Sequence, residues 1–155
     1  MSKTNAVRIL ESKGISFQTL NYEVSETELD ALSVANKIGK DPDSVFKTLV
    51  ARNEQNSLLV FVIPGSCELD LKKAAKASGS KRIEMVKVKE LFDLTGYIRG
   101  GCSPIGMKKS FPTFIDETAL LFDSISISAG IRGMQIIINP DDLSNSTDAC
   151  MVELI

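Results

Sequence analysis

The sequence predicts an α+β fold in which a curved, mixed β-sheet, barrel-like in shape, is flanked by helices. Helix-spaced segments and short strand-like segments follow one another irregularly, which disfavours a doubly wound fold with regular alternation. Beyond residue 96, glycine and β-branched residues dominate, as is typical of short and strongly bent strands. The 155 residues are expected to form one domain, 1–155.

The first part of the chain predicts two short helices around one strand. Apolar residues at helical spacing from Ala6 to Leu10 predict a helix that Gly14 ends. Residues 15–22 are expected to form a strand, and an acidic connection leads from it to a short helix at 33–38.

The middle of the chain predicts a hairpin followed by a helix. The aspartate–proline pair at 41–42 indicates one helical turn, because aspartate caps helices and proline suits their first turn. Residues 46–52 and 58–63 are rich in apolar and β-branched side chains and surround a polar segment, which indicates a β-hairpin. Asp70 is placed to cap a helix over residues 71–79.

The last part of the chain predicts mostly strands. One helix is expected where apolar residues recur at helical spacing from Val88 to Thr95, before Gly96. The expected strands are 83–86, 113–115, 124–128 and 134–138.

Composition excludes several kinds of site. The chain has no histidine, which removes Ser-His-Asp and Cys-His catalytic arrangements and histidine-ligated metals. The three cysteines, Cys67, Cys102 and Cys150, are too few for a four-cysteine zinc site, and their wide spacing favours reduced thiols in a cytoplasmic protein. No metal, cofactor, signal sequence or membrane association is therefore expected.

The charge bears on nucleic-acid binding. Proteins that grip a duplex along its length are usually strongly basic, whereas this chain has a net charge of −2. A local basic rim could still hold the end of a nucleic acid. The charge lowers the expectation of nucleic-acid binding without excluding it.

Two glycine-rich segments, residues 100–106 and 128–133, are candidate ligand-binding loops. Glycine lets the backbone approach a ligand closely, and consecutive backbone N–H groups can bind an anion or an oxyanion. Tight turns in a curved sheet explain the same glycines, and neither segment matches a phosphate-binding fingerprint. The loops are flanked by the basic residues Arg99, Lys108, Lys109 and Arg132.

Three single residues are further candidates. Lys47 lies near the start of an apolar strand, where it is either desolvated and functional or packs its stem along the sheet with its ammonium in water. Tyr22, at a strand end, could hydrogen-bond a ligand or be simply half-buried. Cys102 lies in a glycine-rich loop, but no histidine is available to activate it, so we interpret it as a packing residue.

These motifs have the order and spacing of a known family. The chain resembles the YbaK/EbsC family, the stand-alone cysteinyl-tRNA(Pro) deacylases related to the editing domain inserted in bacterial prolyl-tRNA synthetases. The most specific string is Gly-Gly-x-Ser-Pro-x-Gly-x-Lys-Lys at 100–109, and the similarity runs from Lys3 to about Leu143. The other matching segments are Phe46-Lys47-Thr48-Leu49, residues 68–76, Thr95-Gly96-Tyr97 and residues 128–133.

The resemblance implies a pocket that receives the aminoacylated 3′ end of tRNA, without a cofactor. It implies that Lys47 is the key active-site residue. It also implies that cleavage is substrate-assisted, with the thiol of the attached cysteine attacking its own ester carbonyl. The residues implied to bind substrate are Tyr22, Phe46, Gly100, Gly101, Ser128, Gly130 and Gln135.

Three functional interpretations stay open. The first is a deacylase of Cys-tRNA(Pro), with Cys-tRNA(Cys) as a second candidate substrate, working beside prolyl-tRNA synthetase. The second is a deacylase of another small misattached amino acid such as alanine, which has no thiol and needs an activated water or the tRNA 2′-hydroxyl. The third is a non-catalytic module that binds tRNA or a synthetase. Ile131 stands where the family usually has lysine, which removes one basic contact near the entrance.

Overall fold

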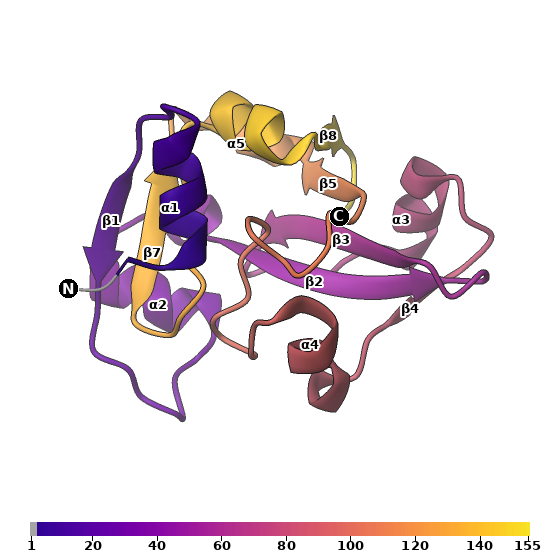
Figure 1. Ribbon diagram of the computed structural model, residues 1–155, viewed down its shortest axis with the longest axis horizontal. Helices are drawn as coiled ribbons and strands as arrows, with labels where there is room; N and C mark the ends of the chain where they lie inside the picture. Colours follow the sequence, from indigo (N-terminus) through magenta and orange to yellow (C-terminus); the bar gives the residue numbers. More distant parts are fainter. Residues whose placement is uncertain (1–2) are drawn as a thin grey trace.

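The structure, a computed structural model, describes residues 3–155 and contains two β-sheets (Figure 1). One sheet has the strand order β1-β7-β6 and the other β4-β2-β3-β5-β8. The predicted α+β class with mixed strand directions is confirmed, but the strands form two sheets and not a closed barrel. None of the helices in residues 3–155 is long and apolar enough to cross a membrane.

The elements follow one another as the sequence indicates in most of the chain. The helices are α1 (Asn5–Ser12), α2 (Ala31–Ile38), α3 (Leu71–Ser78), α4 (Val88–Thr95) and α5 (Pro140–Thr147), with the 3-10 turns η1 (Pro42–Ser44) and η2 (Glu117–Leu121). The strands are β1 (Gln18–Asn21), β2 (Phe46–Asn53), β3 (Leu58–Pro64), β4 (Ile83–Met85), β5 (Thr113–Asp116), β6 (Ile125–Ser128), β7 (Met134–Ile138) and β8 (Cys150–Val152).

Side-chain caps fix the starts of several helices. The Asp70 carboxylate accepts hydrogen bonds from the backbone N–H groups of Lys72 and Lys73, both at 3.0 Å, which satisfies donors that the first turn of α3 leaves free. Asp30 caps α2 in the same way, so this helix begins at Ala31, two residues before the prediction.

Strand β3 lies at the centre of the larger sheet and is buried on both faces. On one face Val60 and Val62 pack against α1 and the smaller sheet, and on the other Phe61 stacks on Phe114 at 5.5 Å between ring centroids. A strand buried on both faces has a continuous apolar sequence, which explains the run at 58–63.

The C-terminal tail contains two elements that were not predicted. Asn139 caps α5 through the backbone N–H groups of Asp141 and Asp142, and Pro140 occupies the first turn. Strand β8 then pairs in parallel with β5 at the edge of the larger sheet. Figure 1 shows α5 and β8 together along one border of the molecule, with the C-terminus returning toward β3.

Candidate functional site

A large cavity in the described part of the chain opens where the two sheets separate. A single parallel bridge, Val45 to Ser126, joins the start of β2 to β6, and residues 3–155 contain no further ladder pair between these strands. Beyond this bridge β2 and β6 therefore diverge. The cavity of about 570 Å³ is lined from both strands and from the segments around them.

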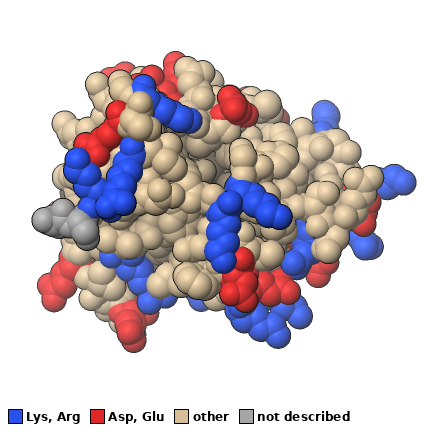
Figure 2. Space-filling model, viewed as in Figure 1, with Lys and Arg blue, Asp and Glu red and all other residues tan. Residues whose placement is uncertain are grey.

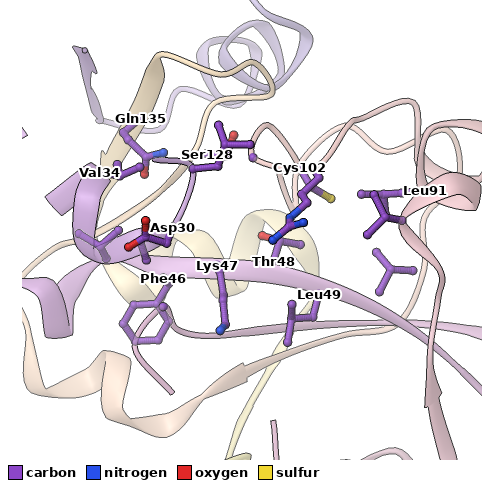
Figure 3. A pocket seen from close by; sticks show the side chains of 18 of the residues that line it. Asp30, Val34, Phe46, Lys47, Thr48, Leu49, Leu91, Cys102, Ser128 and Gln135 are labelled. Atoms are coloured by element: carbon purple, nitrogen blue, oxygen red, sulfur yellow. The ribbon is translucent and has the colours of Figure 1, made fainter. Parts of the chain in front are cut away.

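One wall is an open strand edge. Strand β4 pairs only with residues 51–53 of β2, so the first half of β2 has an outer edge without a β4 partner. Successive side chains of a strand point to opposite faces, so Lys47 and Thr48 leave β2 in opposite directions. Figure 3 shows Lys47 on one side of the β2 ribbon and Ser128 and Cys102 on the other. The cavity is thus lined by both faces of this edge.

Polar groups on this edge have no partners inside the protein. The hydroxyl oxygen of Thr48 is buried and has no hydrogen bond within residues 3–155. The half-buried Lys47 ammonium likewise makes no ion pair or hydrogen bond with any described residue. A buried hydroxyl without a partner costs free energy, so its place in a cavity wall points to a ligand group or water as its missing partner.

The opposite wall is the polar face of the smaller sheet. Strand β6 alternates isoleucine and serine, so Ile125 and Ile127 enter the core while Ser126 and Ser128 share the other face. Gln135 is opposite Ser128 in the ladder and lies on the same face. This wall places buried polar side chains beside a cavity that is otherwise largely apolar.

The orientation of the Gln135 amide follows from its hydrogen bond. Its side chain is 5% exposed, and its Oε1 accepts the hydroxyl of Ser126 at 2.8 Å. The Nε2 group makes no hydrogen bond with a described residue and belongs to a side chain that lines the cavity. Gln135 therefore presents a fixed N–H donor to whatever enters.

The two glycine-rich loops close the third side by packing on each other. Arg132 Nε donates to the carbonyl of Arg99 at 2.9 Å, and a Cβ on Gly101 would lie 3.1 Å from the backbone of Ile131 and Arg132. Gly100 lines the cavity with φ +84°, a conformation that other residues rarely adopt. The glycines here permit close backbone packing and a left-handed turn at the same place.

Some backbone donors of these loops are already used within the protein. The N–H of Gly101 donates to the carbonyl of Ile98 at 2.9 Å, and the N–H of Gly130 donates to Ser128 Oγ at 3.2 Å. Ala129 donates to Met134 within the turn between β6 and β7. The N–H groups of Gly100 and Cys102, two residues that line the cavity, have no partner among the described residues and remain available to a ligand.

Cys102 lines the cavity as a buried neutral thiol. Burial raises the pKa of Cys102 to about 12, so the thiolate is scarce at neutral pH. Since a thiol attacks as the thiolate, this environment does not suit a nucleophile. The interpretation of Cys102 as a packing residue agrees with its contacts to Val50 and Tyr97 in one apolar cluster.

The cavity also has walls that were not predicted. The segment from β4 into α4 contributes Met85, Val86, Val88 and Leu91, and α2 contributes Asp30 and Val34. Burial is slight at Asp30, whose pKa is lowered mainly by the Ser33 hydroxyl hydrogen bond, so it is ionised at neutral pH. The apolar spacing of α4 was visible in the sequence, but it indicates a helix face without saying what that face meets.

The structure brings five of the eight predicted site residues to this cavity: Phe46, Lys47, Gly100, Ser128 and Gln135. Tyr22, Gly101 and Gly130 are not among the lining residues. Tyr22 packs behind α2 with Val34 and Val45, and Gly130 approaches the Tyr97 ring, where a Cβ would lie 2.9 Å from a ring carbon. These three support the walls from outside.

Charge around the molecule is mixed. Figure 2 shows basic and acidic side chains interspersed on one face, with a large uncharged area between them. Arg99 is exposed and reaches the lining of the cavity, and Arg132 is tied to its backbone. The basic charge near the cavity is therefore local, which fits the expectation of a basic rim on a chain with a net charge of −2.

Known proteins resemble this chain over most of its length. Residues 26–145 match the family described as the aminoacyl-tRNA editing domain. The chain is 47% identical over 152 residues to EbsC of Enterococcus faecalis, a proposed Cys-tRNA(Pro)/Cys-tRNA(Cys) deacylase, with 98% of this chain and 93% of that protein covered. It is 28% identical over 103 residues to the proline–tRNA ligase of Shouchella clausii, covering 66% of this chain and 18% of the ligase.

Solved structures share the fold. A proposed trans-editing enzyme for prolyl tRNA synthetase superposes with a TM-score of 0.81 at 24% identity, covering 99% of this chain and 98% of the other. A hypothetical protein superposes with a TM-score of 0.87 at 19% identity, covering 96% and 97% of the two chains.

Proposed function

Because the chain belongs to the aminoacyl-tRNA editing domain family, we propose that it removes cysteine wrongly attached to proline tRNA, and also acts on cysteinyl-tRNA(Cys). The observation that carries this proposal is the 47% identity to EbsC, which extends over 98% of the chain. The cavity between the sheets supports it, because this cavity offers free hydrogen-bond donors and apolar walls to a small aminoacyl group.

The chemistry of the cavity favours a nucleophile brought by the substrate. The chain has no histidine, and the only thiol in the lining has a pKa raised to about 12 by burial. A cysteine ester carries its own thiol close to its carbonyl carbon. Attack by that thiol forms a C–S bond and breaks the C–O bond to the ribose, and the thiol proton passes to the leaving ribose oxygen. Intramolecular attack of this kind can supply a large part of the rate.

The protein then has to orient the ester and stabilise charge. Gln135 Nε2 and the Gly100 N–H are free donors on the walls, and we assign them to the carbonyl oxygen, which becomes negative during attack. Lys47 leaves β2 on the face opposite to this wall, and we assign its flexible stem to reach round the open strand edge. There its ammonium anchors the acceptor end and stabilises the developing negative charge.

Prolyl-tRNA synthetase is the proposed partner. A similar stretch occurs inside the proline–tRNA ligase of Shouchella clausii, and the mixed surface charge of this chain predicts weak, salt-sensitive binding to free tRNA. Delivery of the charged tRNA by the synthetase would make up for that weak affinity. Tight tRNA binding that the synthetase does not change would contradict this part of the proposal.

The test is to follow release of the amino acid from Cys-tRNA(Pro), Ser-tRNA(Pro) and Ala-tRNA(Pro) by the purified protein and by Lys47→Ala. Rapid loss of cysteine alone, abolished by the substitution, supports the thiol-assisted reaction. Loss of alanine or serine at a similar rate overturns the mechanism and the specificity. Absence of turnover on all three esters overturns the enzymatic proposal.

A further inference from the structure

An apolar surface continues out of the cavity along α4. Val88 and Leu91 line the cavity, yet Val88 is also 61% exposed. Phe92 follows one helical turn after Val88 and is 56% exposed, so both side chains share one face of the helix. Met85, which also lines the cavity, is exposed at the start of the same wall. We refer to Met85, Val88 and Phe92 as the α4 rim.

A cation is held over the exposed ring. Lys108 Nζ lies 5.5 Å from the centroid of the Phe92 ring and donates to the carbonyl of Asp93 at 3.1 Å. The ammonium therefore has a defined place, while more than half of the Phe92 surface stays open to solvent. Single exposed apolar residues need no explanation, but this ring is aromatic, paired with a cation and continuous with a cavity wall.

Proteins that bind single-stranded nucleic acid use exposed aromatic rings beside basic side chains. Bases stack on exposed aromatic rings, and nearby lysine or arginine side chains neutralise the phosphates that connect them. Lys87 and Lys89 are exposed on the same helix segment, and Arg99 reaches the cavity from the loop after α4. The acidic Glu90 is paired with Arg52 at 2.9 Å, which leaves Asp93 as the carboxylate close to Lys108.

We propose that the α4 rim and Lys108 bind the unpaired nucleotides that precede the terminal adenosine of the tRNA acceptor end. The inference rests on the proposed function, because the aminoacylated adenosine then occupies the cavity. A base stacks on Phe92, and Lys108 contacts the adjoining phosphate. The rim thereby sets the path by which the strand enters between the sheets.

The first experiment measures binding without any ester. The chain has no tryptophan, so Phe92→Trp introduces a single fluorescent reporter on the rim. We expect an RNA oligonucleotide ending in CCA to quench this fluorescence saturably, and added salt or Lys108→Ala to weaken the quenching. The matched control is Leu121→Trp, whose native side chain is 80% exposed in η2 and outside the lining, and which should not respond.

Two results of this experiment would overturn the inference. Equal responses of the two tryptophan variants would show that contact with RNA is not specific to the rim. Quenching by prolyl-tRNA synthetase alone, with no response to RNA, would assign the rim to a protein partner. Because the oligonucleotide carries no amino acid, a positive result would stand even if the chain proved not to be a deacylase.

The second experiment locates the contact along the substrate. Phe92→Ala should raise KM about tenfold for a cysteinylated minihelix ending in CCA and leave cleavage of cysteinyl-adenosine unchanged, since the shorter ester lacks the stacked base. Phe92→Tyr, which keeps an aromatic ring, should restore the KM. An equal loss on both substrates would mean that Phe92 acts on the cavity itself and would contradict the proposed path.

Discussion

Two cavities in the described part of the chain differ in how their polar groups are used. In the smaller one, of about 210 Å³, Lys13 donates to the carbonyl of Ser146 and Thr147 to that of Leu143, both at 2.8 Å. Thr113 is likewise bonded, to the carbonyl of Phe111 at 3.0 Å. The Ser146 hydroxyl also donates to the carbonyl of Leu143, at 2.9 Å, and the remaining polar side chains of that cavity, Lys109 and Ser110, are exposed to water.

In the larger cavity the same kinds of group are free. Thr48 Oγ1 is buried without a partner, and the Gln135 amide nitrogen and the Lys47 ammonium make no bond to described residues. Folding normally satisfies buried polar groups, so the buried Thr48 hydroxyl, beside the free Gln135 amide nitrogen and Lys47 ammonium, indicates a site whose partners arrive with a ligand. Cavity size alone would not separate a binding site from a packing gap; the unsatisfied donors do.

The largest effect should come from Lys47 in the larger cavity, with Lys13 of the smaller cavity as its control. Lys47→Ala is expected to lower kcat/KM for Cys-tRNA(Pro) by about 100-fold or more, because it removes the cation that stabilises the developing charge. Lys13→Ala, in the smaller cavity, should leave the rate within about twofold, since Lys13 is exposed and only caps the Ser146 carbonyl. Single-turnover deacylation measures both. Similar losses in the two variants would remove the functional distinction between the cavities.

A smaller effect is expected at the amide donor. Gln135→Leu removes the free N–H while keeping an apolar volume, and should lower kcat by about tenfold to 100-fold, with a modest effect on KM. The control in the smaller cavity is Thr147→Val, whose hydroxyl is bonded within α5. Ser126→Ala frees the Gln135 amide to rotate and should lower kcat by a smaller factor than Gln135→Leu. An unchanged kcat in Gln135→Leu would refute the role of this donor.

Local sequence signals predict the elements of this fold better than their assembly. Asp70 and the apolar run at 58–63 identify a helix start and a buried strand, because capping and burial act through the residues themselves. The parallel pairing of β5 with β3 and β8 joins segments distant in sequence, and no local signal specifies it. Strand β8 is short and half-exposed, so its sequence has little strand character, whereas the start of α5 carries a local signal, an asparagine cap followed by proline at 139–140.

The site was predictable where the family resemblance names its residues. Lys47 and Gly100 both line the cavity, as the family resemblance implies, whereas their sequence context alone left each of them open. Thr48 could not be found, because a threonine in a strand is ordinary and only the missing hydrogen bond distinguishes it. The α4 wall was equally hidden, since its apolar residues fit a core-facing helix until the structure shows them at a cavity mouth.

Substitutions in the wall made by the glycine-rich loops should lower the free energy of unfolding. Gly101→Ala places a Cβ 3.1 Å from the backbone of residues 131 and 132. Because the neighbouring atoms belong to the backbone, no side-chain rotation can relieve this close contact. We expect a loss of about 2 kcal/mol in unfolding free energy. Gly14→Ala is the comparison: nothing lies within 4 Å, and only its φ of +68° opposes the substitution, at about 1 kcal/mol. Urea unfolding compares the two. A larger loss in Gly14→Ala would mean that close packing does not hold this wall.

The smallest effect on deacylation is expected from substitution of Cys102. This test decides whether Cys102 lies in the larger cavity for a chemical role or for packing. Its pKa of about 12 keeps the thiol protonated, so iodoacetamide at pH 8 should modify the exposed Cys150 long before Cys102. Burial raises the pKa of the Cys102 thiol in the folded state. The contribution of this thiol to the free energy of unfolding is therefore complete below its ordinary pKa of 9.0 and is lost as pH rises toward 12. Cys102→Ala should then keep deacylation within about threefold, since the attacking thiol belongs to the substrate and not to the protein. Rapid alkylation of Cys102 together with loss of activity in Cys102→Ala would instead make it a nucleophile, and the free donors around it would serve an enzyme-bound intermediate.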